Sequence, residues 1–212
     1  MSKANAAVNA LSEQISKLQE SITSMDKKLS SIDAKLDTTQ SSVQSVKLHV
    51  NNLEQNQQQS CVCIYGLELP TNINNSPIST AKFVYESLRP ILEVALKENT
   101  LPSIPSCFDL IDTAHLLPAK ADKVPAIYVR FRSKLYCLAI MLSKGKYFKE
   151  TVEKKFSITD DLTRVNAKLL KSFTERNDAA AAWFRINKVC YKLKSDPEKI
   201  LSARATINDC SP

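Results

Sequence analysis

Tyrosine and arginine occupy every second position of the stretch "AIYVRFR", at Tyr128, Arg130 and Arg132. Successive side chains of a β-strand point to opposite faces, so these three would share one face and the alternating apolar residues the other. Tyrosine rings can stack on bases without reading sequence, and guanidinium groups pair with phosphates. The stretch therefore predicts a strand with one core face and one face suited to contact with a nucleic acid.

Basic residues are concentrated in the same third of the chain. Residues 120–194 contain eighteen basic and seven acidic residues, a net charge of +11, whereas the whole chain of 212 residues carries +7. This distribution predicts a basic surface for a polyanionic partner. The candidate nucleic-acid contacts are Tyr65, Tyr128, Arg130, Arg132, Lys134, Lys168, Lys171, Arg185, Lys192 and Lys194.

Two alternative interpretations of these side chains remain open. For any one lysine, a solvated surface position is the simpler interpretation. Tyr65 and Tyr128 could instead be covered by the C-terminal part of the chain or by a neighbouring subunit.

As a group, the side chains predict a basic groove between two folded units. Neutralisation of about six phosphates there would give a log–log salt slope of ~−4 for single strands.

The sequence offers little for catalysis or metal binding. None of the six cysteines stands in a C-x-x-C pair, neither histidine lies beside a cysteine, and the two glycines do not make a phosphate-cradling loop. Asp160 and Asp161 are interpreted as helix-start residues, Trp183 as a core residue, and His115 as a hydrogen-bonding residue at a strand end. We therefore expect no enzyme activity, no metal and no cofactor.

Apolar residues recur in steps of three and four through the first sixty residues, which is the spacing of coiled-coil a and d positions. The one polar member of the repeat is Thr39. About 46 residues of helix would extend ~70 Å, more than a small domain can cover, so we expect the partner to be another copy of this chain or a related chain. The predicted oligomerisation residues are Leu11, Ile15, Leu18, Ile22, Met25, Leu29, Ile32, Leu36, Val43, Val46, Val50 and Leu53.

The stretch "KLSSID" bears on the number of helices in the coiled coil. It places Leu29 at an a position and Ile32 at a d position, which favours more than two helices, and flanks them with Lys28 and Asp33. This arrangement is similar to the Arg-h-x-x-h-Glu pattern of trimeric coiled coils. A trimer is therefore favoured over a dimer. The polar "NNLEQNQQQS" that follows predicts a frayed helix end or a short hinge.

Strand and helix signals alternate after residue 60. They predict strands at 61–65, 107–118, 125–132 and 155–158, and helices at 79–99 and 133–143. Ser79 and Ser133 are the expected N-caps, and Pro90 is expected to kink the first helix. The apolar face of the second helix is expected at Leu135, Leu138, Ala139 and Leu142. The order β-α-β-β-α-β is that of the split βαβ fold, which RNA-recognition (RRM) domains also use.

A smaller unit is expected to follow. The sequence predicts a helix capped by Thr159 or Thr163, a hairpin around Asn187–Lys188, and a last short helix opened by Ser195. The predicted fold class is α+β. It combines a coiled coil over residues 1–58, an RRM-like (ferredoxin-like split βαβ) domain over 60–158, and a small α/β C-terminal domain over 159–212.

An ordered series of segments resembles a known family. "IYGL", "DTAHLLP", "PAIYVRFRSKL", "ITDDLTRVNAKLL" and "AWFRINKVCYKLK" follow one another over about residues 60–200. The series resembles the first open-reading-frame protein of LINE-type (non-LTR) retrotransposons and the C-terminal domain of baculovirus few-polyhedra (FP) proteins. The chain departs from the family at Leu116, where arginine is frequent, and at Lys188, where glycine is frequent. It also has no zinc knuckle.

The resemblance implies a homo-oligomeric, sequence-tolerant protein that binds single-stranded RNA or DNA and acts as a nucleic-acid chaperone. The alternative is a coiled-coil structural or adaptor protein, FP-like, whose basic surface binds an acidic protein. The polar N-terminus and the lack of a long apolar run predict no membrane association. We expect an intracellular protein, in a cytoplasmic ribonucleoprotein particle or in the nucleus.

Overall fold

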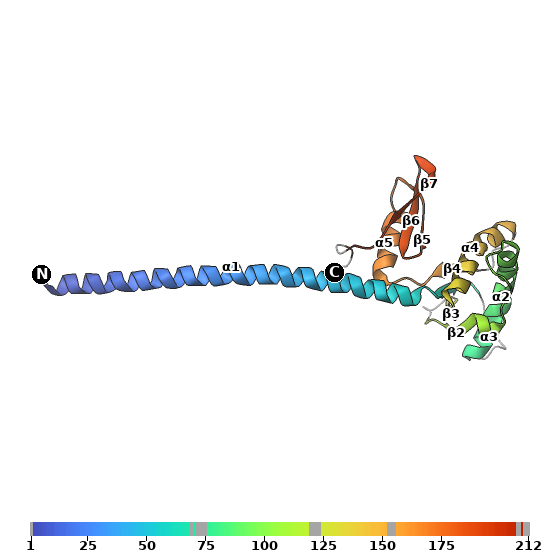
Figure 1. The fold of residues 1–212 in the computed structure, drawn as a ribbon, viewed down its shortest axis with the longest axis horizontal. Coiled ribbons are helices and arrows are strands. Elements are labelled where there is room, and N and C mark those ends of the chain that lie inside the picture. Colours follow the sequence, from blue (N-terminus) through green and yellow to red (C-terminus); the bar gives the residue numbers. More distant parts are fainter. Residues whose placement is uncertain are drawn as a thin grey trace.

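A long N-terminal helix leads into two separate β-sheets, each with its own helices (Figure 1). The computed structural model describes residues 2–67, 70, 76–118, 124–151, 156–206 and 209. The chain exposes 14604 Å² to solvent. A compact globular protein of 23.7 kDa would expose only ~9,800 Å². The excess reflects the helix, which extends away from both sheets.

Helix α1 (Ser2–Gln58) has 57 residues, which corresponds to a length of ~85 Å. All twelve predicted oligomerisation residues lie on it, and their exposed fractions range from 45% to 62%. The helix also runs through the stretch for which a frayed end or hinge was predicted. That prediction was wrong because Asn51 and Gln55 are buried against a later part of the chain, which holds the last turns in place. None of the described helices is long and apolar enough to cross a membrane.

The first sheet is antiparallel and has the strand order β2-β3-β1-β4. Helices α2 and α4 pack against each other and against this sheet, and a short helix, α3, precedes β2. The order β-α-β-β-α-β is therefore present, with α3 as an addition. The elements are β1 (Cys61–Tyr65), α2 (Pro77–Lys97), α3 (Cys107–Leu110), β2 (Ile111–Leu116), β3 (Ile127–Phe131), α4 (Lys134–Glu150) and β4 (Ser157–Asp160).

The core of this unit lies between the sheet and its two helices. Ile127, Val129 and Phe131 are at most 2% exposed, which confirms the predicted inner face of β3. Val129 pairs with Val62 of β1 across the sheet, and both side chains contribute to the core. Helix α2 adds a row of fully buried aliphatic side chains, among them Leu88, so the hydrophobic effect fixes the register of the central strands.

Two local predictions in this unit were wrong. Helix α2 is capped by Ser76 and not by Ser79, because the Ser76 hydroxyl accepts the backbone N–H of Ser79 at 3.2 Å. The helix then continues through Pro90. Residues 107–110 form α3 and not the start of a strand, because Ser106 caps this turn by accepting the backbone N–H of Asp109.

Helix α4 has the predicted N-cap but a different buried face. The Ser133 hydroxyl accepts the backbone N–H of Leu135 at 3.2 Å, and the helix then runs well beyond Ser143 to Glu150. Leu135 and Leu142 are 64% and 45% exposed. The buried residues of the helix are Cys137, Ala139, Ile140 and Ser143. Of the predicted face, Ala139 is buried and Leu138 is half-buried, whereas the prediction was wrong for Leu135 and Leu142.

We expect Ser133→Ala to lower the free energy of unfolding of this unit by about 1 kcal/mol, the usual value of a serine N-cap. Amide exchange in the first turn of α4 should increase with it. Ser133→Asp keeps an acceptor for the Leu135 amide and places a negative charge at the helix N-terminus, so it should retain wild-type stability. Urea unfolding followed by amide exchange measures both; equal losses in the two variants would contradict the cap assignment.

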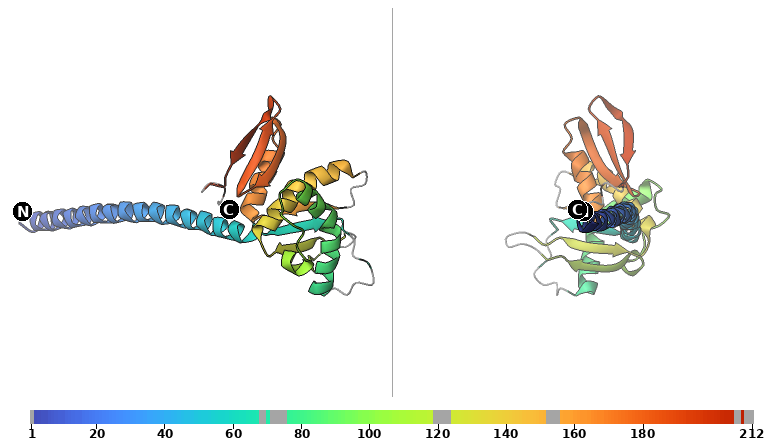
Figure 2. Two further views of the ribbon diagram at one scale, coloured as in Figure 1. Left: turned by 45° about the vertical axis from the view of Figure 1, so that its right-hand side comes forward. Right: turned by 90° about the vertical axis from the view of Figure 1, so that its left-hand side faces the viewer.

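The second sheet has the order β5-β6-β7 and carries helix α5 on one side (Figure 2). Its elements are α5 (Arg164–Thr174), β5 (Ala179–Arg185), β6 (Lys188–Leu193) and β7 (Asp196–Ala203). Thr163 is the N-cap of α5, and Thr159 instead belongs to β4. The Phe173 and Tyr191 rings meet at 4.6 Å between helix and sheet, and the Arg176 guanidinium lies over both.

Two predictions for this unit were wrong. Residues after Ser195 form strand β7 and not a helix, because they pair with β6; Pro197 is tolerated on this edge strand. The hairpin turns one residue earlier than expected, at Ile186 and Asn187, whose φ angles are 48° and 58°. Positive φ at both central residues is characteristic of a type I′ hairpin turn, and a β-branched isoleucine adopts it only under strain.

Candidate functional site

The face of the first sheet that lies opposite its helices carries an aromatic pair. The Tyr128 hydroxyl donates to the Cys61 sulfur at 3.0 Å, and its ring lies 5.0 Å from that of His115. The pKa of Tyr128 is raised, mainly by burial and secondly by this hydrogen bond. His115 pairs with Tyr128 across β2 and β3 and is itself exposed. It is therefore a member of this face, one residue before the end of β2. A bulge between Ile111 and Thr113 shifts the register, so simple alternation along β2 does not reveal this.

Tyr65 stands at the end of β1 and is 47% exposed. Cys61 and Cys63, which share its face in the strand alternation, are both buried. The face is therefore open near Tyr65 and His115 but closed over the centre of β1. Gln55 of α1 contributes to this closure, because its amide donates to the Asp161 carbonyl at 3.0 Å just beyond β4.

Arg130 and Arg132 have different surroundings. The Arg130 guanidinium bonds Asp112 through Nε at 2.6 Å and Nη2 at 2.5 Å, and this hydrogen bond and charge raise its pKa. The charge of Arg130 is thus largely balanced by a carboxylate from the neighbouring strand. Arg132 is exposed and has no ion pair with any acidic group in the part of the chain that the structure describes. Of the two, Arg132 is more readily available to an external anion.

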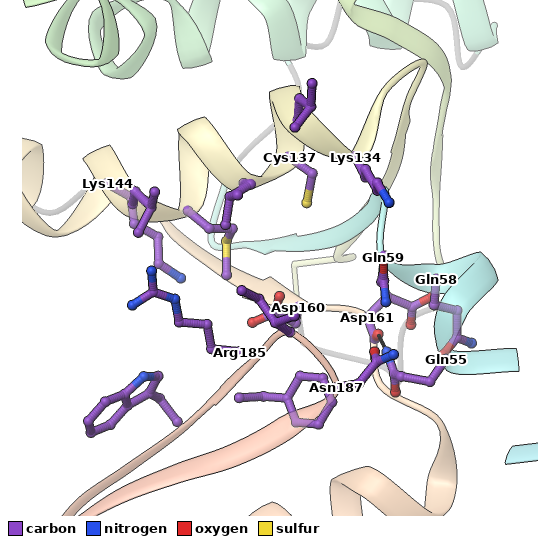
Figure 3. Close-up of a pocket in the computed structure, with 17 residues that line it drawn as sticks. Gln55, Gln58, Gln59, Lys134, Cys137, Lys144, Asp160, Asp161, Arg185 and Asn187 are labelled. Carbon is purple, nitrogen blue, oxygen red and sulfur yellow. Dashed lines mark hydrogen bonds between the residues drawn. The ribbon is translucent and has the colours of Figure 1, made fainter. Parts of the chain in front are cut away.

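A pocket of about 460 Å³ lies where the end of α1, helix α4, the end of β4 and the β5–β6 hairpin meet (Figure 3). Lys134 and Lys144 reach it from α4, and Arg185 reaches it from the hairpin. The structure thus brings together Lys134 and Arg185, two predicted contact residues that are 51 positions apart. The remaining lining residues are Gln55, Gln58, Gln59, Leu135, Cys137, Leu138, Met141, Leu142, Asp160, Asp161, Trp183, Phe184, Ile186 and Asn187.

Charge in the pocket is arranged by depth. Lys144 is half-buried and donates to the Ile158 carbonyl at 2.6 Å, and desolvation lowers its pKa. Burial raises the pKa of Asp160, while the charge of Lys144 opposes that rise. Burial also raises the pKa of Asp161. These three groups partly balance one another in the interior, whereas Lys134 and Arg185 are exposed. The outer part of the pocket is therefore positive.

Aromatic and aliphatic side chains complete the wall of the pocket. Trp183 is half-buried in it, so its predicted role as a core residue was wrong. Leu135, Leu142 and Ile186 add apolar surface and are each at least 45% exposed. An indole ring beside exposed cations can stack on a planar group while the cations bind a nearby anion. The sequence concealed this arrangement because Trp183 and α4 are joined only by the tertiary fold.

Two buried acceptors on the pocket wall lack a hydrogen-bond partner among the described residues. They are Gln58 Oε1 and Asn187 Oδ1. The other amide atom of Asn187, Nδ2, donates to Asn56 Oδ1 at 2.5 Å, which fixes the side chain at the hairpin tip. A buried acceptor without a donor is unfavourable, so the wall is suited to a ligand that supplies N–H groups.

The remaining predicted contact residues lie away from the pocket lining. Lys168 and Lys171 are exposed on α5, and Lys171 forms an ion pair of 3.6 Å with Glu175. Lys192 belongs to β6, and Lys194 follows it in the next turn. The predicted groove is therefore formed by only part of the predicted set, and these four lysines lie elsewhere on the second unit.

No protein-family model matches the sequence, and no curated protein is significantly similar to it. Within the described ranges, no group of three or more histidine, cysteine, aspartate or glutamate side chains is arranged to hold a metal ion. The geometry of the pocket and of the open sheet face therefore carries the functional argument.

Proposed function

We propose that this chain forms a homo-oligomer that binds single-stranded RNA or DNA with little sequence preference and acts as a nucleic-acid chaperone of retrotransposon type. The observation that carries the proposal is the pocket at the junction of α1, α4 and the hairpin. It combines an indole with exposed cations and unpaired acceptors. Single-strand binding proteins use this combination of a stacking surface and a positive groove.

The first sheet supports the proposal as an RRM-like unit. Its strand order β4-β1-β3-β2, with both long helices on one side, is the arrangement expected of a split βαβ fold. Tyr65, Tyr128 and His115 supply rings on the other side. Where a bound strand extends beyond the pocket, its bases could stack on these rings and a phosphate could pair with the Arg132 guanidinium.

The exposed repeat on α1 supports self-association. Twelve apolar side chains at a and d positions are about half exposed in the single chain. Coiled-coil formation would bury them, and a trimer fits Leu29 and Ile32 best. Several binding surfaces in one assembly would raise affinity for a long strand through effective concentration.

Fluorescence anisotropy with a labelled single-stranded RNA over a salt series tests the binding proposal. Six neutralised phosphates would give a log–log slope of ~−4. Affinity should differ little between RNAs of unrelated sequence. A slope near zero, or no binding in low salt, would exclude the electrostatic mechanism and with it the proposed function.

A protein partner is the second candidate, and the exposed Leu135, Leu142 and Ile186 favour it. On this alternative, the coiled coil is an adaptor and the basic surface binds an acidic protein that also contacts these apolar groups. An acidic peptide carrying leucine or phenylalanine should then bind more tightly than an RNA of equal charge. Competition between the two ligands in the same anisotropy assay separates the candidates.

Asp112→Ala is expected to strengthen RNA binding by a few-fold. The substitution releases Arg130, whose guanidinium then becomes available to a phosphate, and the log–log salt slope should steepen by ~0.7. Because the pair is more than one-third exposed on the arginine side, its loss should change stability little. Glu93→Ala on the outer face of α2 removes one acidic charge elsewhere and is the matched control. Weaker binding by Asp112→Ala would mean that the ion pair orders the sheet face.

A further inference from the structure

The last turns of α1 are held to the start of α5 by a cluster of four buried polar residues. This clamp consists of Asn51, Gln55, Thr163 and Asn166, each at most 5% exposed. The Thr163 hydroxyl donates to Asn51 Oδ1 at 2.6 Å. Gln55 Oε1 accepts the Thr163 backbone N–H at 3.1 Å and the Asn166 amide at 2.8 Å. Gln55 therefore satisfies two donors that would otherwise be buried without a partner.

The clamp and the oligomerisation repeat occupy different faces of α1. Asn51 and Gln55 are four residues apart and lie on one face of the helix. With Val50 at a and Leu53 at d, they take the b and f positions, which point away from a coiled-coil interface. Val50 and Leu53 remain 45% and 50% exposed although the clamp is formed. A coiled coil can therefore assemble along α1 down to its last turns without disturbing the clamp.

The same two turns of α1 also build the pocket. Gln55, Gln58 and Gln59 line it, and the Gln55 amide donates to the carbonyl of Asp161, another lining residue. Asn56 accepts the amide of Asn187 at the hairpin tip, which forms a further part of the wall. This wall exists only while residues 51–59 keep their present conformation, because hydrogen bonds from Gln55 and Asn56 hold Asp161 and Asn187.

A single solvated helix with a narrow apolar stripe is marginally stable in water. Most of the stability of α1 must then come from assembly with other copies. If assembly maintains the last turns of α1, it also maintains Gln55 at Thr163 and the glutamines at the pocket. Conversely, a ligand that binds the pocket favours the helical form of these turns, and with it assembly.

We propose that Asn51 and Gln55 are positioning residues that link assembly of α1 to the shape of the pocket. A ligand in one pocket strengthens assembly, and assembly strengthens ligand binding by the same factor, as linkage requires. The ligand arm of this inference rests on the proposed nucleic-acid function. The other part of the inference, that the clamp forms together with the assembly, does not rest on that function.

The experiment uses the full chain, the variant Asn51→Ala/Gln55→Ala, and the control Gln40→Ala/Asn52→Ala, which removes the same two residue types from exposed positions of α1. Sedimentation equilibrium gives the concentration of half-assembly with and without hexauridylate, which is too short to bridge subunits. We expect hexauridylate to lower this concentration on the order of tenfold for the wild type and the control. The clamp variant should show no shift. Equal shifts in all three proteins would overturn the proposal.

Hydrogen exchange at the Thr163 amide tests, without any nucleic acid, whether the clamp depends on assembly. Protection of this amide should fall when the wild type is diluted below its assembly concentration, and the clamp variant should be unprotected throughout. Protection that does not depend on assembly would refute the coupling. If hexauridylate did not bind, but protection of the Thr163 amide still depended on assembly, the proposed function would be refuted. The link between the clamp and assembly would still stand. Gln55→Met, which keeps the side-chain length without its hydrogen bonds, should behave as the clamp variant does and serves if the double variant is unfolded.

Discussion

Replacing Leu29 and Ile32 with aspartate is expected to dissociate the protein into single chains and to weaken binding to a long single-stranded RNA by 10²-fold or more. The two side chains are 57% and 58% exposed in the single chain and occupy the centre of the apolar repeat. Two carboxylates at neighbouring a and d positions of an assembled coil would be buried without counter-charges, which is strongly unfavourable. Loss of effective concentration accounts for the fall in affinity, since linked sites typically gain 10²–10⁴-fold.

Sedimentation velocity measures the dissociation, and anisotropy with a long labelled RNA measures the affinity. Ser31→Asp/Ala34→Asp is the matched control: it adds the same two charges with the same spacing, at c and f positions outside the repeat. This control should remain assembled and bind RNA nearly as the wild type does. If the variant with aspartate at Leu29 and Ile32 were monomeric yet bound the long RNA with unchanged affinity, avidity would not be the mechanism.

Removing three exposed cations, as in Arg132→Ala/Lys134→Ala/Arg185→Ala, should weaken RNA binding by about 10²-fold at moderate salt and flatten the log–log salt slope by ~2. Lys134 and Arg185 stand on opposite walls of the pocket, and Arg132 lies two residues before Lys134. Each cation that is removed leaves one phosphate unneutralised, so that fewer counterions are released on binding. Because all three side chains are exposed, the melting temperature should hardly change.

The control for this triple variant is Lys82→Ala/Arg89→Ala/Lys97→Ala on the solvent-facing side of α2. It lowers the net charge by the same amount on a helix that contributes no residue to the pocket. Its salt slope should stay close to that of the wild type. Equal flattening in both triple variants would indicate that net charge, and not the pocket, governs binding. A large fall in melting temperature for the pocket variant would show instead that the three cations are structural.

The sequence was sufficient for several features that spacing within one element decides. The repeat on α1, the caps at Ser133 and Thr163, and the buried face of β3 all follow from spacing within one element. Local caps at Ser76 and Ser106 decided two of the failures, and contacts between distant segments decided others. Asp112 neutralises Arg130 across two strands, and pairing with β6 makes a strand of residues that carry a helix-start signal after Ser195.

The candidate site shows the same division. Exposed basic side chains were identifiable one by one, but their grouping was not. Lys134 and Arg185 line the same pocket because the hairpin lies beside α4, whereas Lys168 and Lys171 do not line it. The spacing of the leucines of α4 suggested a buried face, yet Leu135 and Leu142 border the pocket, and Cys137 and Ile140 are buried in the core instead. Trp183 could be recognised as a pocket residue only once that border was known.

The placement of both sheets near one end of α1 has a consequence for how RNA would be organised (Figure 1). In a parallel bundle, every pocket gathers at one pole, while the opposite pole lies ~85 Å away along bare coil. A strand that visits several subunits must then fold back around a single head instead of running along a filament. The molecule would compact RNA into a bundle of short loops, and electron microscopy of the complexes should show compact heads with projecting rods.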